Sequence, residues 1–271
     1  MPTITIDLIK TFRDLTGAPI DACKKALTAV DGDIELAKEE LKRLGLSTTR
    51  TVVPEAGTIG FYESSTAYVF VVAKSETDFV SRNEDFMKAA YRAAESLAEN
   101  RATHHQMKET FKEDTLAFRE NCEIQRTVVL SKHTLGPAQA CAYYIHHNYQ
   151  RAAIVVYDLL SASGDQVAGT AQHTAGDRVA KQVVATSPKV VRREQLGADL
   201  LSQVEAELIE GERALGKPEA KIPQIVAGKL AKRMSEQVLL DQAMFDEPGK
   251  TVGNMCIAAG IAIDNFTNIT V

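Results

Sequence analysis

The sequence predicts an α+β fold: a small N-terminal three-helix bundle, two related α+β subdomains with antiparallel sheets, and a projecting antiparallel helical hairpin. Three observations predict it. Apolar residues follow helical spacing near the N-terminus, strand-like runs alternate with helical segments through the middle, and two helical rows without strand signals come later. The expected units are a docking module at 1–46, a linker at 47–56, a first core subdomain at 57–135 and a second at 136–271.

The N-terminal segment contains three short helical patterns. Leu8, Phe12 and Leu15 share one helix face in the first, which Gly17 ends. A proline suits the first turn of the second helix, and Asp33 can cap the third. Because so small a bundle buries little apolar surface, we expect it to dock against another surface.

The middle of the chain alternates between strand and helix signals. Residues 58–62 and 66–73 are predicted to form a hairpin, and a helix is predicted from Glu84 to Leu97. Further helices are expected at 107–120 and before Pro188, and further strands at 123–130, 138–146 and 152–159. A hairpin followed by a helix, twice over, indicates two related subdomains, although the repeat is one of pattern only.

Two helical rows at about 198–238 predict the projecting hairpin. Gly216-Lys217-Pro218 separates the rows, whose apolar members are Leu200, Val204 and Leu208, then Ile222, Val226, Leu230, Met234 and Val238. Two core helices are the alternative. A hairpin in solvent is favoured by a set of charged residues: Lys217, Glu219, Lys221, Lys229, Lys232 and Arg233.

Composition limits the class of protein. The chain has 271 residues, 45% apolar and 25% charged, which is ordinary for a globular protein. A net charge of −5 argues against a nucleic-acid-binding surface, so no direct nucleic-acid contact is expected. The four cysteines are scattered, as in a reducing compartment. Apolar runs stop short of the ~18 residues of a membrane helix, and no signal-peptide pattern is present, so we expect a soluble intracellular protein without membrane contact.

Motifs that would indicate chemistry are weak. Gly249-Lys250-Thr251 resembles the end of a phosphate-binding loop, but Met244 occupies the position that needs a glycine. The adjacent pairs His104-His105 and His146-His147 have the wrong spacing for two metal ligands on one face, which leaves a single functional histidine in the second pair open. No Gly-x-Ser-x-Gly nucleophile pattern occurs. We therefore expect neither a metal nor a cofactor.

The most informative segment is Thr77-Asp78-Phe79-Val80, between a predicted buried strand and a predicted helix. A carboxylate beside a large aromatic side chain at such a junction stands at the rim of the fold, where it can meet a substrate or a protein. Three structural alternatives remain open: Asp78 as a helix cap, residues 81–84 as a capping box, and Phe79 as a core residue.

Several motifs occur in a fixed order along residues 5–255: 15–20, 23–27, 32–37, 76–83, 120–126, 144–146, 216–229, 239–242 and 250–252. They include Leu-Thr-Gly-Ala-Pro-Ile, Cys-Lys-Lys-Ala-Leu, Glu-Thr-Asp-Phe-Val-Ser-Arg-Asn and Leu-Leu-Asp-Gln. Together they resemble the elongation factor Ts family, and their order makes the resemblance specific.

The resemblance implies nucleotide exchange on the GTPase elongation factor Tu without covalent chemistry, and a UBA-like N-terminal module. It implies that Thr77, Asp78, Phe79 and Val80 disturb the magnesium site of that GTPase. Other partner-binding positions would be Leu15, Pro19, Ile20, Lys24, Asn121, Ile124 and His146. The hairpin would serve a homodimer or secondary contacts, and the location would be the bacterial cytoplasm or an organelle matrix.

The chain departs from the family pattern in places. Asp21 and Ala22 stand where the family often has methionines, and Tyr149 lies where it commonly has glycines, so partner contacts there are expected to differ. Two other functions compete with exchange. One is a diverged helical-bundle adaptor that binds a partner without exchange, and the other is an α+β hydrolase using Asp78 and His146.

Overall fold

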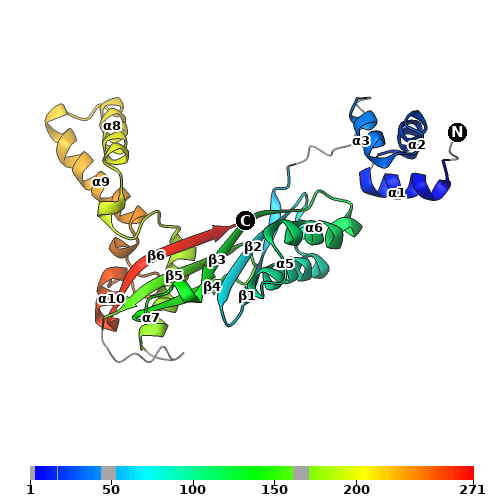
Figure 1. Cartoon of the computed structure of the whole chain (residues 1–271). Helices are drawn as coiled ribbons and strands as arrows, with labels where there is room; N and C mark the ends of the chain where they lie inside the picture. The colour runs from blue at the N-terminus through cyan, green and yellow to red at the C-terminus, as the bar shows by residue number, and fades with distance from the viewer. Residues whose placement is uncertain (1–3, 17, 44–52, 161–170) are drawn as a thin grey trace.

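The computed structural model describes residues 4–16, 18–43, 53–160 and 171–271; the predicted end at Gly17 and most of the predicted linker lie outside them. At the N-terminus, three helices form a small bundle: α1 (Ile6–Thr16), α2 (Ile20–Ala29) and α3 (Ile34–Arg43) (Figure 1). Its buried core contains Phe12, Cys23, Leu27 and Leu41.

The start of α3 follows from a side-chain cap. The Asp33 carboxylate accepts hydrogen bonds from the backbone N–H groups of Glu35 and Leu36, at 2.9 and 3.0 Å. These donors have no partner inside the first helical turn, so the cap satisfies them. The cap predicted at Asp33 is confirmed.

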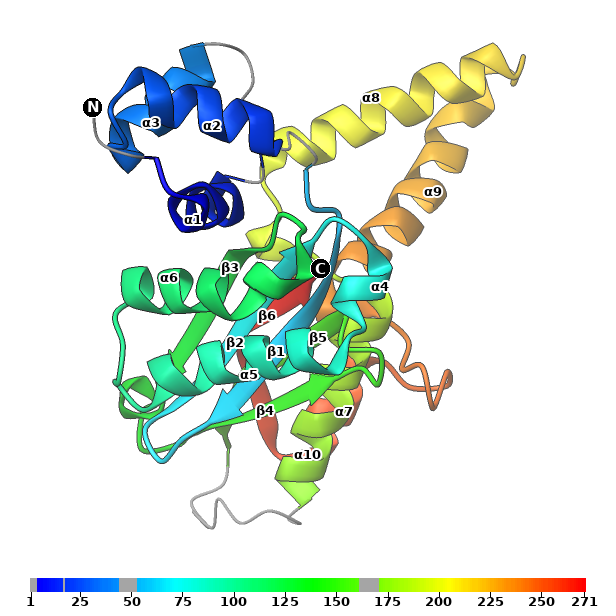
Figure 2. The ribbon, with the colours of Figure 1, turned by 90° about the vertical axis from the view of Figure 1, so that its right-hand side faces the viewer.

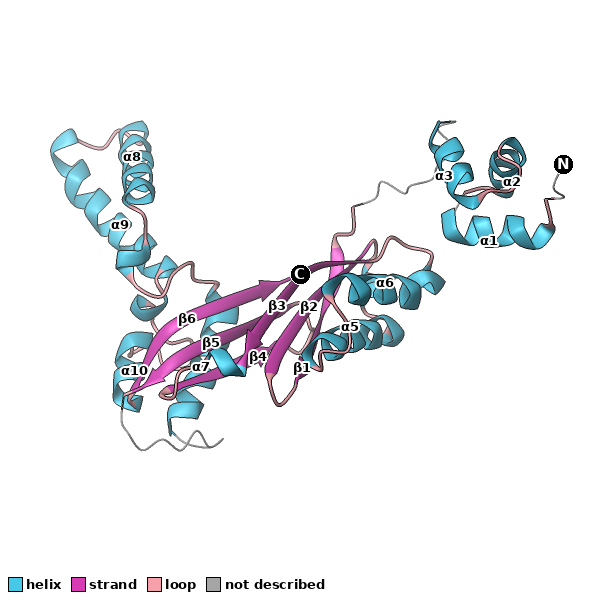
Figure 3. Cartoon of the chain, viewed as in Figure 1, coloured by secondary structure: helices cyan, strands magenta, loops and turns pink. Residues whose placement is uncertain are grey.

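Two antiparallel three-stranded sheets form the core (Figure 3). The first has the order β1 (Ala56–Glu63), β2 (Ala67–Ser75) and β3 (Glu123–Ser131). The second has the order β4 (Gln139–Ile145), β5 (Arg151–Leu159) and β6 (Ile261–Thr270). The predicted hairpins are present, whereas β6 was not predicted.

The two sheets pack face to face. Their shared core contains Ile59, Phe70 and Val72 from the first sheet and Ile154 and Ile269 from the second. Side chains alternate along a strand, so the opposite face of each sheet needs its own cover. The first sheet is covered by α5 (Glu84–Ala98) and α6 (His104–Thr115), and the second by α7 (Ala171–Thr186) and α10 (Val252–Ala259). The core is thus a layered arrangement of helices, two sheets and helices, as Figure 1 shows.

The helix α5 approaches β1 closely because Gly60 has no side chain. A Cβ atom at Gly60 would lie 2.2 Å from the carbonyl oxygen of Ala90.

The predicted helix at 107–120 begins earlier, at His104, because Thr103 and Gln106 form a capping box. It ends at Thr115, before a short 3₁₀ turn.

The predicted hairpin consists of α8 (Ala198–Ala214) and α9 (Ile222–Gln237), which project from the sheets (Figures 1 and 2). Val204, Leu208, Leu230 and Met234 form its apolar seam together with Val238, and Gly216 turns the chain with a φ of +69°. The fold class predicted from the sequence is confirmed, including the projecting hairpin. No helix in the described part of the chain has the length and apolarity to cross a membrane.

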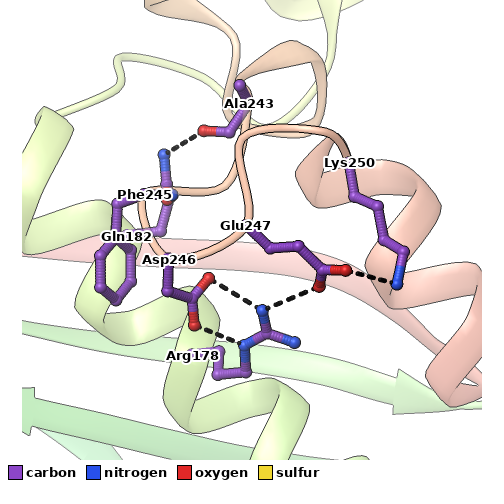
Figure 4. Close-up of polar contacts among 7 residues, drawn as sticks. All are labelled: Arg178, Gln182, Ala243, Phe245, Asp246, Glu247 and Lys250. Carbon is purple, nitrogen blue, oxygen red and sulfur yellow. Dashed lines mark hydrogen bonds and ion pairs between the residues drawn. The ribbon is translucent and has the colours of Figure 1, made fainter.

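The segment 243–251 joins the hairpin to α10 and is fastened to α7 (Figure 4). The fully buried Gln182 donates to the Ala243 carbonyl at 3.2 Å and accepts from the Phe245 N–H at 2.9 Å. Arg178 forms an ion pair with Asp246 at 2.8 Å. The Lys250 N–H donates to the Glu247 carbonyl at 3.0 Å, which closes a turn in this segment.

Candidate partner-binding site

Residues 77–80, called the tip below, include most of a single helical turn, α4 (Asp78–Ser81), directly after β2. Thr77 caps this turn, since its Oγ1 accepts from the Val80 N–H at 3.4 Å. Asp78 instead forms an ion pair with Arg82 at 3.5 Å and keeps 54% of its side chain exposed. The cap predicted at Asp78 is therefore wrong by one residue, because the threonine hydroxyl reaches the free N–H first.

The start of α5 corrects a second expectation. Asn83 caps this helix, with its Oδ1 accepting from the Asp85 N–H at 2.8 Å. The capping box proposed from Ser81 to Glu84 is therefore wrong, because the Ser81 hydroxyl donates to the Asp78 carbonyl. Two helix starts thus follow each other within a few residues, and the chain turns sharply at the tip.

Phe79 is 85% exposed, whereas its neighbour Val80 packs partly against the core of the first subdomain. Neighbouring helical residues point about 100° apart, so a single turn resting on the sheet buries one and presents the other. The core alternative for Phe79 is excluded. This side chain contributes almost no burial to the free protein.

The tip is held from the start of β3. Glu120 accepts the Thr77 N–H at 3.0 Å and the Thr77 hydroxyl at 2.6 Å. In return, Glu76 accepts the Asn121 N–H at 2.8 Å. Neither Glu76 nor Glu120 was among the predicted contact residues. Only their position beside the tetrapeptide and beside Asn121 could have indicated a role.

His146 lies just after β4, in a turn at 146–150, and not within a strand as predicted. Its Nδ1 is 2.8 Å from the Asn148 Oδ1, which also accepts from the Gln150 N–H at 3.2 Å. Because this oxygen can only accept, His146 Nδ1 carries the hydrogen in this contact. In the tautomer with this hydrogen on Nδ1, Nε2 is the acceptor nitrogen.

The turn at 146–150 lies at the same end of the paired sheets as the tip. The Ile59 N–H of β1 donates to the Tyr149 carbonyl at 2.7 Å. On the same strand, Ala56 pairs with Ser75, which lies two residues before Thr77 of the tip. The start of β3 also reaches this end, since Glu123 pairs with Lys74. Strand pairing and the backbone hydrogen bond from Ile59 to Tyr149 together bring to one end segments that lie about 70 positions apart along the chain.

The remaining predicted contact residues divide into exposed and buried ones. Asn121 is exposed beside the tip, whereas Ile124 is only 5% exposed and packs in the core. A buried side chain cannot touch a docked protein, so Ile124 can act only by supporting the strand. Tyr149, one of the departures, has a positive φ of 56° and is 43% exposed at this end.

The predicted contacts in the N-terminal bundle lie around the junction of α1 and α2. Leu15 and Ile20 are 54% and 53% exposed, and Pro19 and Lys24 are also exposed. Of the departures, Asp21 is exposed beside Ile20, while the buried Ala22 packs inside the bundle.

A buried cysteine, Cys122, directly precedes β3. Burial raises the pKa of the Cys122 thiol, next to Asn121, to about 11, so the nucleophilic thiolate is scarce at neutral pH. Among the described residues, no group of three or more His, Cys, Asp or Glu side chains could hold a metal ion. What this end presents is an exposed aromatic ring, an ion-paired carboxylate and a histidine nitrogen.

The fold and this surface define a class: a multi-module α+β protein with an N-terminal helical bundle, a paired-sheet core and a helical hairpin. The comparisons agree. The model of the family Elongation factor TS matches residues 76–271, and that of a UBA-like domain matches 6–38. Elongation factor Ts of Rhizobium meliloti (strain 1021) is 32% identical over 269 residues, 92% of this chain and 85% of the relative. That of Vibrio parahaemolyticus serotype O3:K6 is 30% identical over 278 residues, 100% of this chain and 92% of the relative. The chain belongs to the elongation factor Ts family, and its role lies in translation elongation.

Proposed function

We propose that this protein is a guanine nucleotide exchange factor that binds GDP-bound elongation factor Tu and promotes GDP release. The observation that carries the proposal is the exposed Phe79 on a fixed single helical turn, in a chain of the elongation factor Ts family. Exchange on this GTPase places the protein where translation occurs, in the bacterial cytoplasm or an organelle matrix.

The physical basis is differential binding. A GTPase holds GDP through magnesium and through backbone N–H groups aimed at the phosphates. A second protein can weaken GDP only by stabilising a conformation of the GTPase that binds GDP less well. Burying the Phe79 ring in a pocket of the partner supplies roughly 1.5–3 kcal/mol toward that conformation.

The coupling is reciprocal. If the factor weakens GDP binding about a thousandfold, which is roughly 4 kcal/mol, GDP weakens binding of the factor by the same amount. Incoming GTP can then displace the factor, so one molecule of factor can serve many GTPase molecules. No covalent bond changes in this exchange cycle.

The proposal divides the contacts between two surfaces. The tip, with Asp78 beside Phe79, approaches the magnesium and phosphate region, and His146 contacts the GTPase from the same end of the sheets. Leu15, Pro19, Ile20 and Lys24 of the bundle dock separately. Two surfaces joined by one chain raise the effective concentration of the second contact once the first has formed.

The test is release of a fluorescent GDP analogue from elongation factor Tu, with and without this protein at increasing concentration. We expect a saturable acceleration. Binding without acceleration would favour the adaptor function, and absence of both would reject the exchange proposal.

We further propose that the helical hairpin supports a homodimer. Val204, Leu208, Leu230 and Met234 are used in its own seam, but Leu215 at its turn is 68% exposed. Sedimentation velocity over a range of concentrations tests this. A single monomeric species at all concentrations would reject it, and a dimer that Leu215→Glu dissociates would support it.

A further inference from the structure

The tip is connected to the rest of the core by two reciprocal hydrogen-bonded links. The Glu120 carboxylate receives both the N–H and the hydroxyl of Thr77, and the Glu76 carboxylate receives the N–H of Asn121. Thr77, which follows β2, donates to the side chain of Glu120, which precedes β3. Asn121, which also precedes β3, donates in turn to the side chain of Glu76, which follows β2. We call this pair of links the carboxylate latch.

The tip needs such a latch because it cannot hold its own shape. A four-residue helix is far shorter than any helix that is stable alone in water. Its own cap, from Thr77 Oγ1 to the Val80 N–H, is long at 3.4 Å. Bonds to an ionised carboxylate are shorter and stronger than neutral ones, and the Glu120 bonds to Thr77 are 3.0 and 2.6 Å.

The backbone before Glu120 is shaped to deliver it. Arg119 has a φ of +57°, in the left-handed region that residues with a side chain rarely adopt. This residue ends the short 3₁₀ turn at Leu116–Phe118 and redirects the chain so that the next residue, Glu120, meets Thr77. Unusual backbone conformations of this kind cluster where a surface must be held in one arrangement.

We propose that Glu120, assisted by Glu76, is a positioning residue that holds the tip in its binding-ready conformation before the partner arrives. The inference rests on the exchange function proposed above, since it concerns the same surface. Glu120 acts through Thr77 and the placement of Phe79. Without the latch, only a fraction of the molecules present Phe79 correctly, and the apparent affinity for the GTPase falls by that fraction.

The test variant is Glu120→Gln, which keeps the shape of the side chain but removes its charge and one acceptor oxygen. Glu123→Gln is the matched control, because Glu123 lies three residues further on, at the exposed start of β3. Glu76→Gln tests the second link from the opposite side.

The first measurement is backbone amide hydrogen exchange in the free protein, which does not depend on any partner. We expect Glu120→Gln to speed exchange of the Thr77 and Val80 amides by at least about tenfold, with other core amides unchanged. Glu123→Gln should leave both amides as in the wild type. Unchanged protection at Thr77 would overturn the latch, whatever the protein does to GDP. A general loss of protection throughout the core would overturn it as well, by showing that Glu120 supports the whole fold.

The second measurement is GDP release from elongation factor Tu, used as a double-mutant cycle. We expect Glu120→Gln to raise the concentration of factor needed for half-maximal rate by about five- to tenfold, with little change in the maximal rate. In a Phe79→Ala background the same change should have less than about a twofold effect, because the side chain to be positioned is gone. Equal effects in both backgrounds would overturn the proposal. Failure of the wild type to release GDP would reject the exchange function, while the amide measurement would still decide the latch.

Discussion

Replacing Phe79 by alanine separates a contact role from a structural role. The ring is 85% exposed, so only about 15% of its surface is covered in the free protein. Full burial of a phenylalanine is worth roughly 1.5–3 kcal/mol, so truncation should cost less than about 0.5 kcal/mol of folding stability. For a chain of this length, that corresponds to a fall in Tm of less than about 2 °C.

The expected effect on exchange is much larger. If the ring becomes fully buried in the GTPase, its truncation removes roughly 1.5–3 kcal/mol from the exchange-competent complex. Each 1.4 kcal/mol is a factor of ten, so the acceleration per unit of factor should fall about 10- to 150-fold. Stopped-flow release of fluorescent GDP at sub-saturating factor measures this ratio, and calorimetry measures the Tm of the same samples.

Two further phenylalanines serve as controls. Phe245 is 49% exposed on the loop fastened to α7, which covers the second sheet, whereas the tip follows β2 of the first, so Phe245→Ala should leave GDP release unchanged. Phe86 is fully buried, so Phe86→Ala should cost about 3–5 kcal/mol of stability. The reasoning would be refuted if Phe79→Ala lowered the Tm as Phe86→Ala does. It would equally be refuted if GDP release were slowed no more than by Phe245→Ala.

Three other expectations follow from the structure. His146→Gln should promote GDP release from the GTPase nearly as well as the wild type, and His146→Asn about 3- to 10-fold more slowly. Only the longer carboxamide can place an acceptor near the Nε2 position. Equal rates of release with the two variants would contradict the assigned tautomer. The hydrogen bond with Arg178 lowers the pKa of the Asp246 carboxyl, so this group adds stability above its unfolded pKa of about 3.9 and loses it as pH falls through the folded value. Urea unfolding of Arg178→Gln should therefore differ most from the wild type at neutral pH and least in acid. Gly60→Ala should lose about 1–3 kcal/mol through its clash with α5, while Gly211→Ala, in open helical space, should gain about 0.5–1 kcal/mol, both read from denaturant titrations.

The sequence was sufficient for those elements whose signal is local. Hairpins and helices were predictable because apolar spacing and turn residues lie within a few positions of each other, as at β1 and β2. The strand β6 was missed because its pattern is interrupted. Its register with β5 shifts between Val156 and Tyr157, where Asp264 is the extra residue between Ile263 and Asn265. A bulge of this kind breaks the alternation that marks a strand.

The same distinction applies to the candidate site. An acid beside an aromatic residue after a buried strand was visible in the sequence, and so was the alternative that Phe79 is core. Only the packing of the first sheet decides between them, because Val80 and not Phe79 takes the position facing the core. The opposite case is Ile124, which a motif match marked as a contact residue. Its position in the strand buries its side chain, whereas the side chain of Phe79 is exposed.

The residues that hold the tip in place lie far along the chain from Phe79, so a local sequence pattern does not reveal them. Glu120 lies 43 positions after Thr77, and the turn that carries His146 is held to β1 through Tyr149. A local pattern can identify a side chain suited to binding, but its entropic cost of binding depends on whether distant residues already hold it in place. Two carboxylates that look like ordinary surface charges therefore decide how much of the Phe79 burial energy remains available to act on a partner. If the latch holds the tip in the free protein, that energy is not spent on ordering the tip and can instead be directed at the nucleotide site of the GTPase.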